Sequence, residues 1–283
     1  MSVLRSDARA AVAHDLDDSD RRALHELVDT DPHVNAVLAS RLRTVDSLRP
    51  ARIGGRLLGV SDDGELVAAA FAGGNLLPVA GDEDAWAALA HRVGSAPRAC
   101  TSIVGRAEAV HAMWRVLYAG WGPARAVRYA QPLLVAEHVP AVPVDPRVRA
   151  VRLAELDQYL PAAVAMFTEE LGVAPEPTGY RRRVDWLIRS HRAFGIVAAD
   201  GGIVFKADIG AVSASTCQVQ GVWVRPDLRN RGIGTAALAA VFEHALTLAP
   251  SVSLYVNDYN EPARRMYARL GMREVATLAT VLI

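Results

Sequence analysis

The chain has 283 residues, 51% of them hydrophobic, and its 31 basic and 31 acidic side chains give a formal net charge of zero at pH 7. This length suits one large or two medium domains with buried cores, and the zero net charge argues against a nucleic-acid or membrane partner. The only cysteines, Cys100 and Cys217, argue against a disulfide framework or a cysteine-rich metal site and fit a reducing, cytoplasmic compartment.

Targeting segments and metal sites are also not expected. Residues 1–10 carry charges where a signal peptide needs an apolar core, and glycines interrupt the longest uncharged runs before they reach the length of a membrane span. The histidines show no common ligand spacing, so the sequence predicts no metal site.

The first half of the chain predicts a mixed α/β domain. Two helices and then two strands come first, and Ser61-Asp62-Asp63-Gly64 forms the turn between the strands. The expected helices are 19–27, 34–42, 82–93 and 107–117, and the expected strands are 57–60, 66–71, 76–79, 100–104 and 128–135.

A proline-rich stretch separates this half from the next. Residues 138–146 contain three prolines in nine positions, which is typical of an extended, semi-rigid connection. The sequence therefore predicts two domains, residues 1–138 and 148–283, joined by the linker 139–147.

The second half repeats the order of elements seen in the first. β-branched and aromatic residues such as Val219, Val222 and Trp223 mark its fourth strand. The expected strands are 148–151, 193–199, 202–211, 217–224 and 252–256, and the expected helices are 156–170, 180–192 and 236–249.

Between the fourth strand and its helix lies R-x-x-G-x-G, from Arg229 to Gly234. The first N–H groups of a helix lack intrahelical partners, and the helix dipole places about half a positive charge there. Gly232 and Gly234 would let a phosphate approach the main chain, and Arg229 and Arg231 add positive charge. The pattern predicts a pyrophosphate site, although a Gly-x-Gly before a helix by itself fits a simple tight turn equally well.

A second motif follows the strand 252–256: Asn260-x-x-Ala263-x-x-x-Tyr267-x-x-x-Gly271-Met272. With both motifs in order and at the right spacing, residues 148–283 resemble the GNAT (GCN5-related) N-acetyltransferase superfamily. The resemblance implies an α/β fold with a mixed sheet and acetyl-CoA as the co-substrate.

The two halves also align locally, which predicts two GNAT-like folds in tandem. With Ser102-Ile103-Val104 placed over Tyr255-Val256-Asn257, Trp114 falls on Tyr267. A chance match, or a shared helix–turn–strand bias, is the alternative. The first copy is expected to be degenerate, because Asp82-Glu83-Asp84 would repel a pyrophosphate at its helix start and Trp114 cannot act as an acid.

The resemblance implies a role for each motif residue. The backbone of Val222, Trp223 and Val224 would pair with the pantetheine arm, and one of their N–H groups would polarise the thioester carbonyl. Asn260 would contact the cofactor arm, cap its helix, or both. Tyr267 would protonate the departing thiolate, the alternative being a half-buried core tyrosine. The pyrophosphate would be held by Arg229, Asn230, Arg231, Gly232, Ile233, Gly234 and Thr235.

The general base is not marked by a carboxylate on the strand. Gln218 stands where relatives often carry a glutamate, and glutamine can position a water or an amine but cannot take a proton. Glu169 and Glu170 are further candidates, although paired acids at a helix end are more often solvated. A water relay, an acceptor amine that is already partly neutral, or a loss of activity would each accommodate Gln218.

We therefore expect an acetyl-CoA-dependent N-acetyltransferase that acts on a primary amine of a small molecule, an amino acid or a peptide N-terminus. The tandem plan is also similar to that of mycothiol synthase. The alternative is a non-catalytic acyl-CoA-binding or scaffold protein, because the strand carboxylate is missing. The protein would be a monomer with pseudo-dimeric halves or a homodimer.

Overall fold

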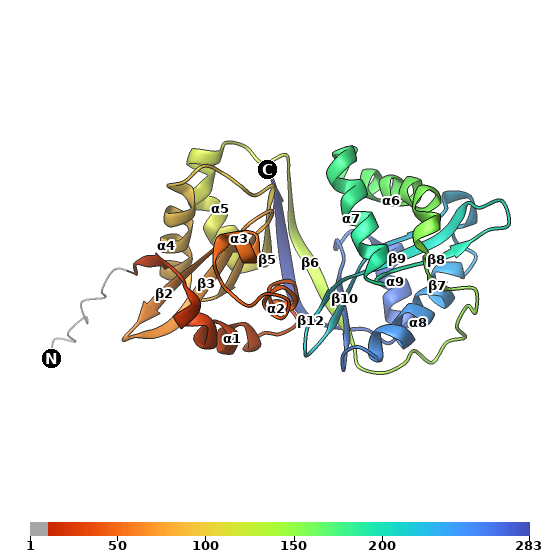
Figure 1. Cartoon of the computed structure of the whole chain (residues 1–283), viewed down its shortest axis with the longest axis horizontal. Helices are drawn as coiled ribbons and strands as arrows, with labels where there is room; N and C mark the ends of the chain where they lie inside the picture. The colour runs from red at the N-terminus through yellow and green to blue at the C-terminus, as the bar shows by residue number, and fades with distance from the viewer. Residues whose placement is uncertain (1–10) are drawn as a thin grey trace. The chain divides into compact units, whose positions relative to one another are not determined.

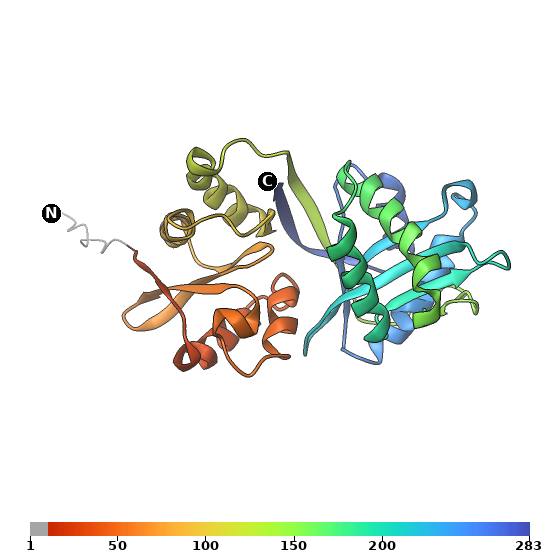
Figure 2. The same cartoon turned by 45° about the horizontal axis from the view of Figure 1, so that its top comes forward.

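The computed structural model describes residues 11–283, which divide by their contacts into two compact units (Figures 1 and 2). Unit 1 runs to Pro132 and also includes Ala276–Ile283, and unit 2 is Leu133–Val275. The segment 1–10, which the sequence argues is not a signal peptide, lies outside the described residues.

Unit 1 contains a mixed sheet in the strand order β1-β2-β3-β4-β5-β12. Strands β4 and β5 run parallel, and the other neighbours in this unit are antiparallel. The C-terminal strand β12 pairs with β5 from Leu278–Arg106 to Leu282–Ser102. The strands are β1 Ala13–Asp15, β2 Arg56–Asp62, β3 Glu65–Ala72, β4 Leu76–Ala80, β5 Ser102–Arg106 and β12 Arg273–Leu282.

Helices cover both faces of this sheet, because the central strands are apolar on both sides. One face packs on α1, α2 and α3 around Leu24 and Phe71, and the other packs on α4 and α5 around Leu89 and Met113. The helices are α1 Arg21–Asp29, α2 Ala36–Leu42, α3 Pro50–Ile53, α4 Glu83–Gly94 and α5 Ala107–Trp121.

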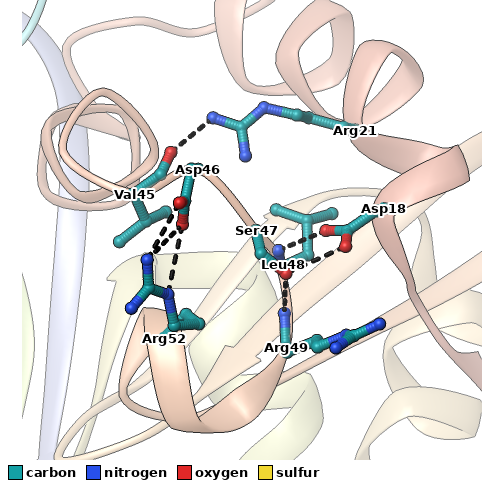
Figure 3. Close-up of polar contacts among 8 residues, drawn as sticks. All are labelled: Asp18, Arg21, Val45, Asp46, Ser47, Leu48, Arg49 and Arg52. Carbon is teal, nitrogen blue, oxygen red and sulfur yellow. Dashed lines mark hydrogen bonds and ion pairs between the residues drawn. The ribbon is translucent and has the colours of Figure 1, made fainter.

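Polar side chains hold the irregular segment that connects α2 to α3 (Figure 3). The Nη2 atom of Arg21 donates to the carbonyl of Val45 at 2.7 Å. The carboxylate of Asp18 accepts the backbone N–H of Leu48 at 2.6 Å. These contacts satisfy backbone groups that no helix or strand pairs, so Arg21 and Asp18 serve the local structure of this segment.

Unit 2 contains a sheet of the same kind in the order β6-β11-β10-β9-β8-β7, with β10 and β11 parallel. The end of β6 pairs with β11, antiparallel, from Leu133–Tyr255 to Ala136–Val252. The strands are β6 Ala126–Ala136, β7 Arg149–Ala150, β8 Ala193–Val197, β9 Ile203–Val212, β10 Cys217–Val224 and β11 Val252–Tyr255.

Two helix layers again enclose the sheet. Helices α6 and α7 lie side by side on one face (green in Figure 1), around Tyr159, Leu187 and Trp223. Helices α8 and α9 cover the other face around Phe242 and Leu254. The helices are α6 Leu156–Leu171, α7 Pro177–Arg189, α8 Ile233–Leu246 and α9 Glu261–Arg269.

The two units repeat one plan. In each, a parallel strand pair brackets a helix and a second helix follows: β4-α4-β5-α5 in unit 1 and β10-α8-β11-α9 in unit 2. The strand beside the second parallel strand is β12 in unit 1 and β6 in unit 2, so each comes largely from the other half of the chain. The tandem α/β fold with mixed sheets is thus confirmed.

The compact units differ from the sequence-based domain limits 1–138 and 148–283. The chain divides inside β6, and residues 276–283 group with unit 1, because β6 and β12 are long strands that pair outside their own halves. The expected linker 139–147 groups with unit 2, where the Asp145 N–H donates to the carbonyl of Ala236 at 3.0 Å. No helix within residues 11–283 is long and apolar enough to cross a membrane.

Candidate active site

The two parallel strands of unit 2 separate soon after they pair. Strands β10 and β11 are paired at only two positions, Cys217–Val252 and Gln218–Ser253. Within the described residues, the remainder of β10, to Val224, has no strand partner on this side. Its backbone groups there can pair with an extended ligand, as an added strand would.

Strand β10 also carries a bulge beyond the point of separation. Two of its residues, Gly221 and Val222, stand opposite the single residue Ala207 of β9. Gly221 has φ +60°, a left-handed conformation that favours glycine. After the bulge, Trp223 packs with the α6–α7 layer and Val224 with the α8–α9 layer. A bulge re-aims the peptide groups of a strand, and this one includes Val222, for which the sequence resemblance implies a contact with the cofactor.

The loop after β10 leads into the N-terminus of α8. Asn230 (φ 61°) and Gly232 (φ 78°) both adopt the left-handed conformation, and the helix begins at Ile233. The carbonyl of Gly232 accepts the N–H of Thr235 at 3.2 Å. The N–H groups of Ile233 and Gly234 therefore precede the first intrahelical bond, which is the arrangement that favours an anion.

The two glycines of the loop have different surroundings. A Cβ atom on Gly232 would meet no atom within 4 Å, so this position faces open space. A Cβ atom on Gly234 would lie 3.2 Å from the Met266 sulfur and from a Val224 methyl group. Gly232 leaves room for a ligand, whereas Gly234 lets α8 pack closely against α9 and the end of β10.

The first arginine of the loop is already engaged by protein groups. Arg229 donates from Nε to the carbonyl of Val224 at 2.9 Å and from Nη2 to Oε2 of Glu169 at 2.7 Å. The other oxygen of Glu169 accepts Nε1–H of Trp223 at 3.1 Å. Glu169 thus ties the end of α6 to β10 and partly compensates the charge of Arg229, while exposed Arg231 makes no ion pair within residues 11–283.

Tyr267 is a buried residue of α9, with 7% of its surface exposed. Within the described part of the chain, its hydroxyl makes no hydrogen bond. Burial first, and the negative charge of Glu170 second, raise the pKa of Tyr267 above its ordinary value. The phenol is therefore protonated at neutral pH, as a proton donor must be.

The other two predicted site residues are Gln218, on β10 beside the start of β11, and Asn260, in the loop that follows β11. Gln218 is buried, 5% exposed, beside Ser253, and its amide makes no hydrogen bond with the described residues. Asn260 accepts the N–H of Ala263 at 3.3 Å and so caps α9. The cap matches one of the two sequence interpretations and leaves a contact with a ligand as a prediction.

The equivalent region of unit 1 is filled by protein atoms. A Cβ atom on Gly105 of β5 would lie 2.9 Å from the ring of Pro78 on β4, so proline packs where unit 2 has its separation. At the start of α4, the carboxylate of Asp82 accepts the N–H of Ala85 at 3.0 Å. An acidic side chain therefore already occupies the helix N-terminus that would attract an anion.

Two features of the site were not singled out from the sequence. The bulge has a signal, because a glycine inside a strand pattern often marks one. The contact of Glu169 with Arg229 joins residues 60 positions apart, and no local pattern predicts it. No group of three or more potential metal-ligating side chains occurs within residues 11–283.

Comparison with known proteins agrees with this architecture. Residues 160–272 match the sequence model described as "Acetyltransferase (GNAT) family", and residues 55–159 match "Domain of unknown function (DUF4081)". No curated protein sequence matches the chain significantly.

Solved structures of GNAT proteins share the fold over nearly the whole chain. An N-acetyltransferase from Sphaerobacter thermophilus is 18% identical, with a TM-score of 0.61 over 96% of each chain. An acetyltransferase from Colwellia psychrerythraea is 12% identical, with a TM-score of 0.59 over 96% of this chain and 99% of that chain. A tandem GNAT protein from the clavulanic acid biosynthesis pathway is 16% identical, with a TM-score of 0.55 over 96% of this chain and 98% of that chain.

At such identities the likeness concerns the fold, which supports acyl transfer from acyl-CoA in general. The sequence match and the two repeated units agree on the same conclusion. Residues 160–272 therefore carry a GNAT acetyltransferase domain, and the chain as a whole has the tandem GNAT fold, with an N-terminal region consistent with a degenerate copy.

Proposed function

We propose that unit 2 binds acetyl-CoA and transfers its acetyl group to a primary amine of a small molecule, an amino acid or a peptide N-terminus. The observation that carries the proposal is the separation of β10 from β11 on a strand that leads into the N-terminus of α8. The open strand edge suits an extended, amide-containing arm, and the helix start suits a pyrophosphate.

The residues of the site fit this substrate. The space at Gly232 and the charge of Arg231 suit phosphate groups, and the backbone of 222–224, which has no strand partner on the side away from β9, suits the pantetheine arm. Acetyl-CoA supplies the activated thioester. A backbone N–H of the bulge polarises its carbonyl, and Tyr267 donates a proton to the leaving sulfur.

Proton removal from the amine needs a different explanation. Gln218 cannot accept a proton, and Glu169 already accepts from Trp223 and Arg229. We therefore propose that a water relay, oriented by Gln218, removes the proton, or that the amine arrives partly neutral.

A second candidate function is acyl-CoA binding without catalysis, and Gln218 in place of a strand carboxylate favours it. Within the enzyme class, a mycothiol-synthase-like reaction is compatible with the tandem plan. We place either function in the cytoplasm, with a monomer of two pseudo-dimeric halves or a homodimer as the working unit. Both cysteines are buried and neither forms a disulfide, which is consistent with a reducing compartment.

Calorimetric titration with acetyl-CoA tests the cofactor. The parent should bind, and Gly232→Glu should not, because it adds a carboxylate at the phosphate position. Gly64→Glu is the matched control, since Gly64 also has a positive φ (87°) and no atom within 4 Å of a Cβ, but lies in the β2–β3 turn. No binding to the parent, or equal loss in both variants, would refute the site.

Release of free CoA thiol with a panel of primary amines tests the transfer. Acetylated product with at least one amine supports the enzyme. Binding of acetyl-CoA without transfer to any amine class would leave the binding-protein alternative.

A further inference from the structure

Lys206, the only lysine of the chain, is completely buried in unit 2. It lies on β9, paired in register with Trp223 of β10. A buried ammonium group is costly unless it is paired and hydrogen-bonded. The groups that contact the Lys206 ammonium therefore indicate the role of this residue.

Three groups surround the ammonium group. Nζ donates to Oδ2 of Asp208 at 2.7 Å and to the carbonyl of Gly221 at 2.9 Å, and it lies 5.5 Å from the ring centroid of Tyr159. The hydroxyl of Tyr159 donates to the other oxygen of Asp208 at 2.7 Å and more weakly to the carbonyl of Phe194 at 3.4 Å. The network thus joins α6, β8 and β9 to one peptide group of β10.

That peptide group lies at the bulge. In a trans peptide unit, the carbonyl of one residue and the N–H of the next point in opposite directions. A donor that fixes the Gly221 carbonyl toward Lys206 also directs the N–H of Val222 away from Lys206. Gly221 itself leaves no room for a side chain, since a Cβ atom would lie 2.8 Å from Nζ and 2.9 Å from a methyl carbon of Met166.

We infer that Lys206 is a positioning residue, which orients the Gly221–Val222 peptide so that the N–H of Val222 is presented to the acyl carbonyl of the bound thioester. This inference rests on the proposed function. Asp208 and Tyr159 hold Lys206 in place, and Lys206 itself touches no substrate. The role differs from support of the core alone, because the lysine contacts a peptide group of the bulge itself.

The test compares two variants that differ in the donor to Gly221. Asp208→Asn removes the carboxylate charge but keeps the amine of Lys206 near the carbonyl. Lys206→Met/Asp208→Asn removes the donor as well, without leaving an unpaired charge. Arg149→Met/Glu155→Gln is the control, because it removes another ion pair of unit 2 at β7, three strands from β10.

The measurement is the infrared carbonyl stretch of acetyl-CoA labelled with ¹³C at the acetyl carbonyl and bound to each protein, with the dissociation constant taken by calorimetry. A hydrogen bond from the bulge lowers this frequency. We expect the lowered frequency in the parent, Asp208→Asn and the control, and a loss of at least about half of the shift in Lys206→Met/Asp208→Asn with affinity changed by less than about threefold. The turnover of that variant should fall about tenfold or more, as expected for a misplaced oxyanion donor.

The outcomes separate the two proposals. If the parent does not bind acetyl-CoA, the proposed function and this inference are both wrong. If it binds, and the frequency and turnover of the double variant equal those of the parent, the positioning role is wrong and the proposed function stands.

A measurement on the parent covers the case in which the double variant does not fold. Selective ¹⁵N labelling of lysine gives a single side-chain signal, because Lys206 is the only lysine. We expect slow proton exchange at Nζ and a changed signal when acetyl-CoA binds. A signal that does not respond to saturating acetyl-CoA would overturn the inference.

Discussion

Replacing Tyr267 with phenylalanine separates a catalytic hydroxyl from a structural one. The hydroxyl of Tyr267 makes no hydrogen bond with the described residues, although the residue is only 7% exposed. Removing a hydroxyl that has no protein partner costs no intramolecular hydrogen bond, so the free energy of unfolding should fall by no more than about 0.5 kcal/mol. Turnover should fall by about a hundredfold, within the range for loss of a general acid.

Tyr159→Phe is the matched comparison, because Tyr159 is a buried tyrosine of the same unit whose hydroxyl is bonded. It donates to the buried carboxylate of Asp208 at 2.7 Å. Its loss leaves a charged acceptor with one partner fewer and should lower the free energy of unfolding by about 1.5–3 kcal/mol. Urea unfolding compares the two variants, and thiol release with a reactive amine gives their turnover.

The pH dependence gives an independent check on Tyr267. Burial raises its pKa above the ordinary value of about 10, so the proton-donating form persists through neutral and mildly alkaline pH. Activity carried by this proton is lost only as pH rises through the raised pKa, and the parent should show no fall from this group below pH 10. Full turnover in Tyr267→Phe would refute the acid role. If Tyr267→Phe lost as much stability as Tyr159→Phe, the hydroxyl of Tyr267 would have to make a hydrogen bond in the folded protein, which would contradict the structure.

Two further variants test the charges of unit 2. Glu169→Gln removes a negative charge beside the phosphate loop, so acetyl-CoA affinity measured by calorimetry should rise about two- to fivefold at low salt and less at high salt. The control is Glu26→Gln in unit 1, which should leave the affinity unchanged. Weaker binding of acetyl-CoA by Glu169→Gln would show instead that the contact between Glu169 and Arg229 shapes the loop. Hydrogen bonds from Arg149 and then Arg152 hold the pKa of Glu155 well below its usual range, so its stabilisation is complete above about pH 4.3 and is lost as the pH falls below that value. At pH 7, the free energy of unfolding of Glu155→Gln, measured with urea, should be about 1–2 kcal/mol lower than that of the parent. This difference should shrink as the pH falls below about 4. A constant difference from pH 7 to pH 3 would contradict this assignment.

Local patterns predicted most of the elements of both units. The motif R-x-x-G-x-G lies where expected, between a strand and the start of α8, because turn and helix-start signals act within a few residues. The short β1 and α3 were not expected, since three or four residues carry too little pattern to be recognised.

The pairing of strands that lie far apart in the chain could not be predicted from the sequence. Strand β12 was not among the expected elements, and no local signal shows that its last residues pair with β5 in unit 1. The site shows the same limit. The position of Lys206 has no local sequence signal, because its contact with Gly221 joins residues 15 positions apart across a bulge that only the folded sheet forms.

The pairing of β12 with β5, and of β6 with β11, makes each half of the chain necessary to the sheet of the other half. Residues 278–282 of β12, which follow α9 in the chain, are buried and pair with β5 of unit 1. Residues 133–136 of β6, which follow α5, pair with β11 beside the separation that forms the candidate site. Each sheet is therefore completed by a strand from the other half, and an unpaired edge there would expose backbone groups and apolar side chains. Asp82 and Pro78 fill the place of an anion site in unit 1 without affecting this structural role. Deleting residues 1–138, in contrast, would remove β6, the strand that pairs with β11.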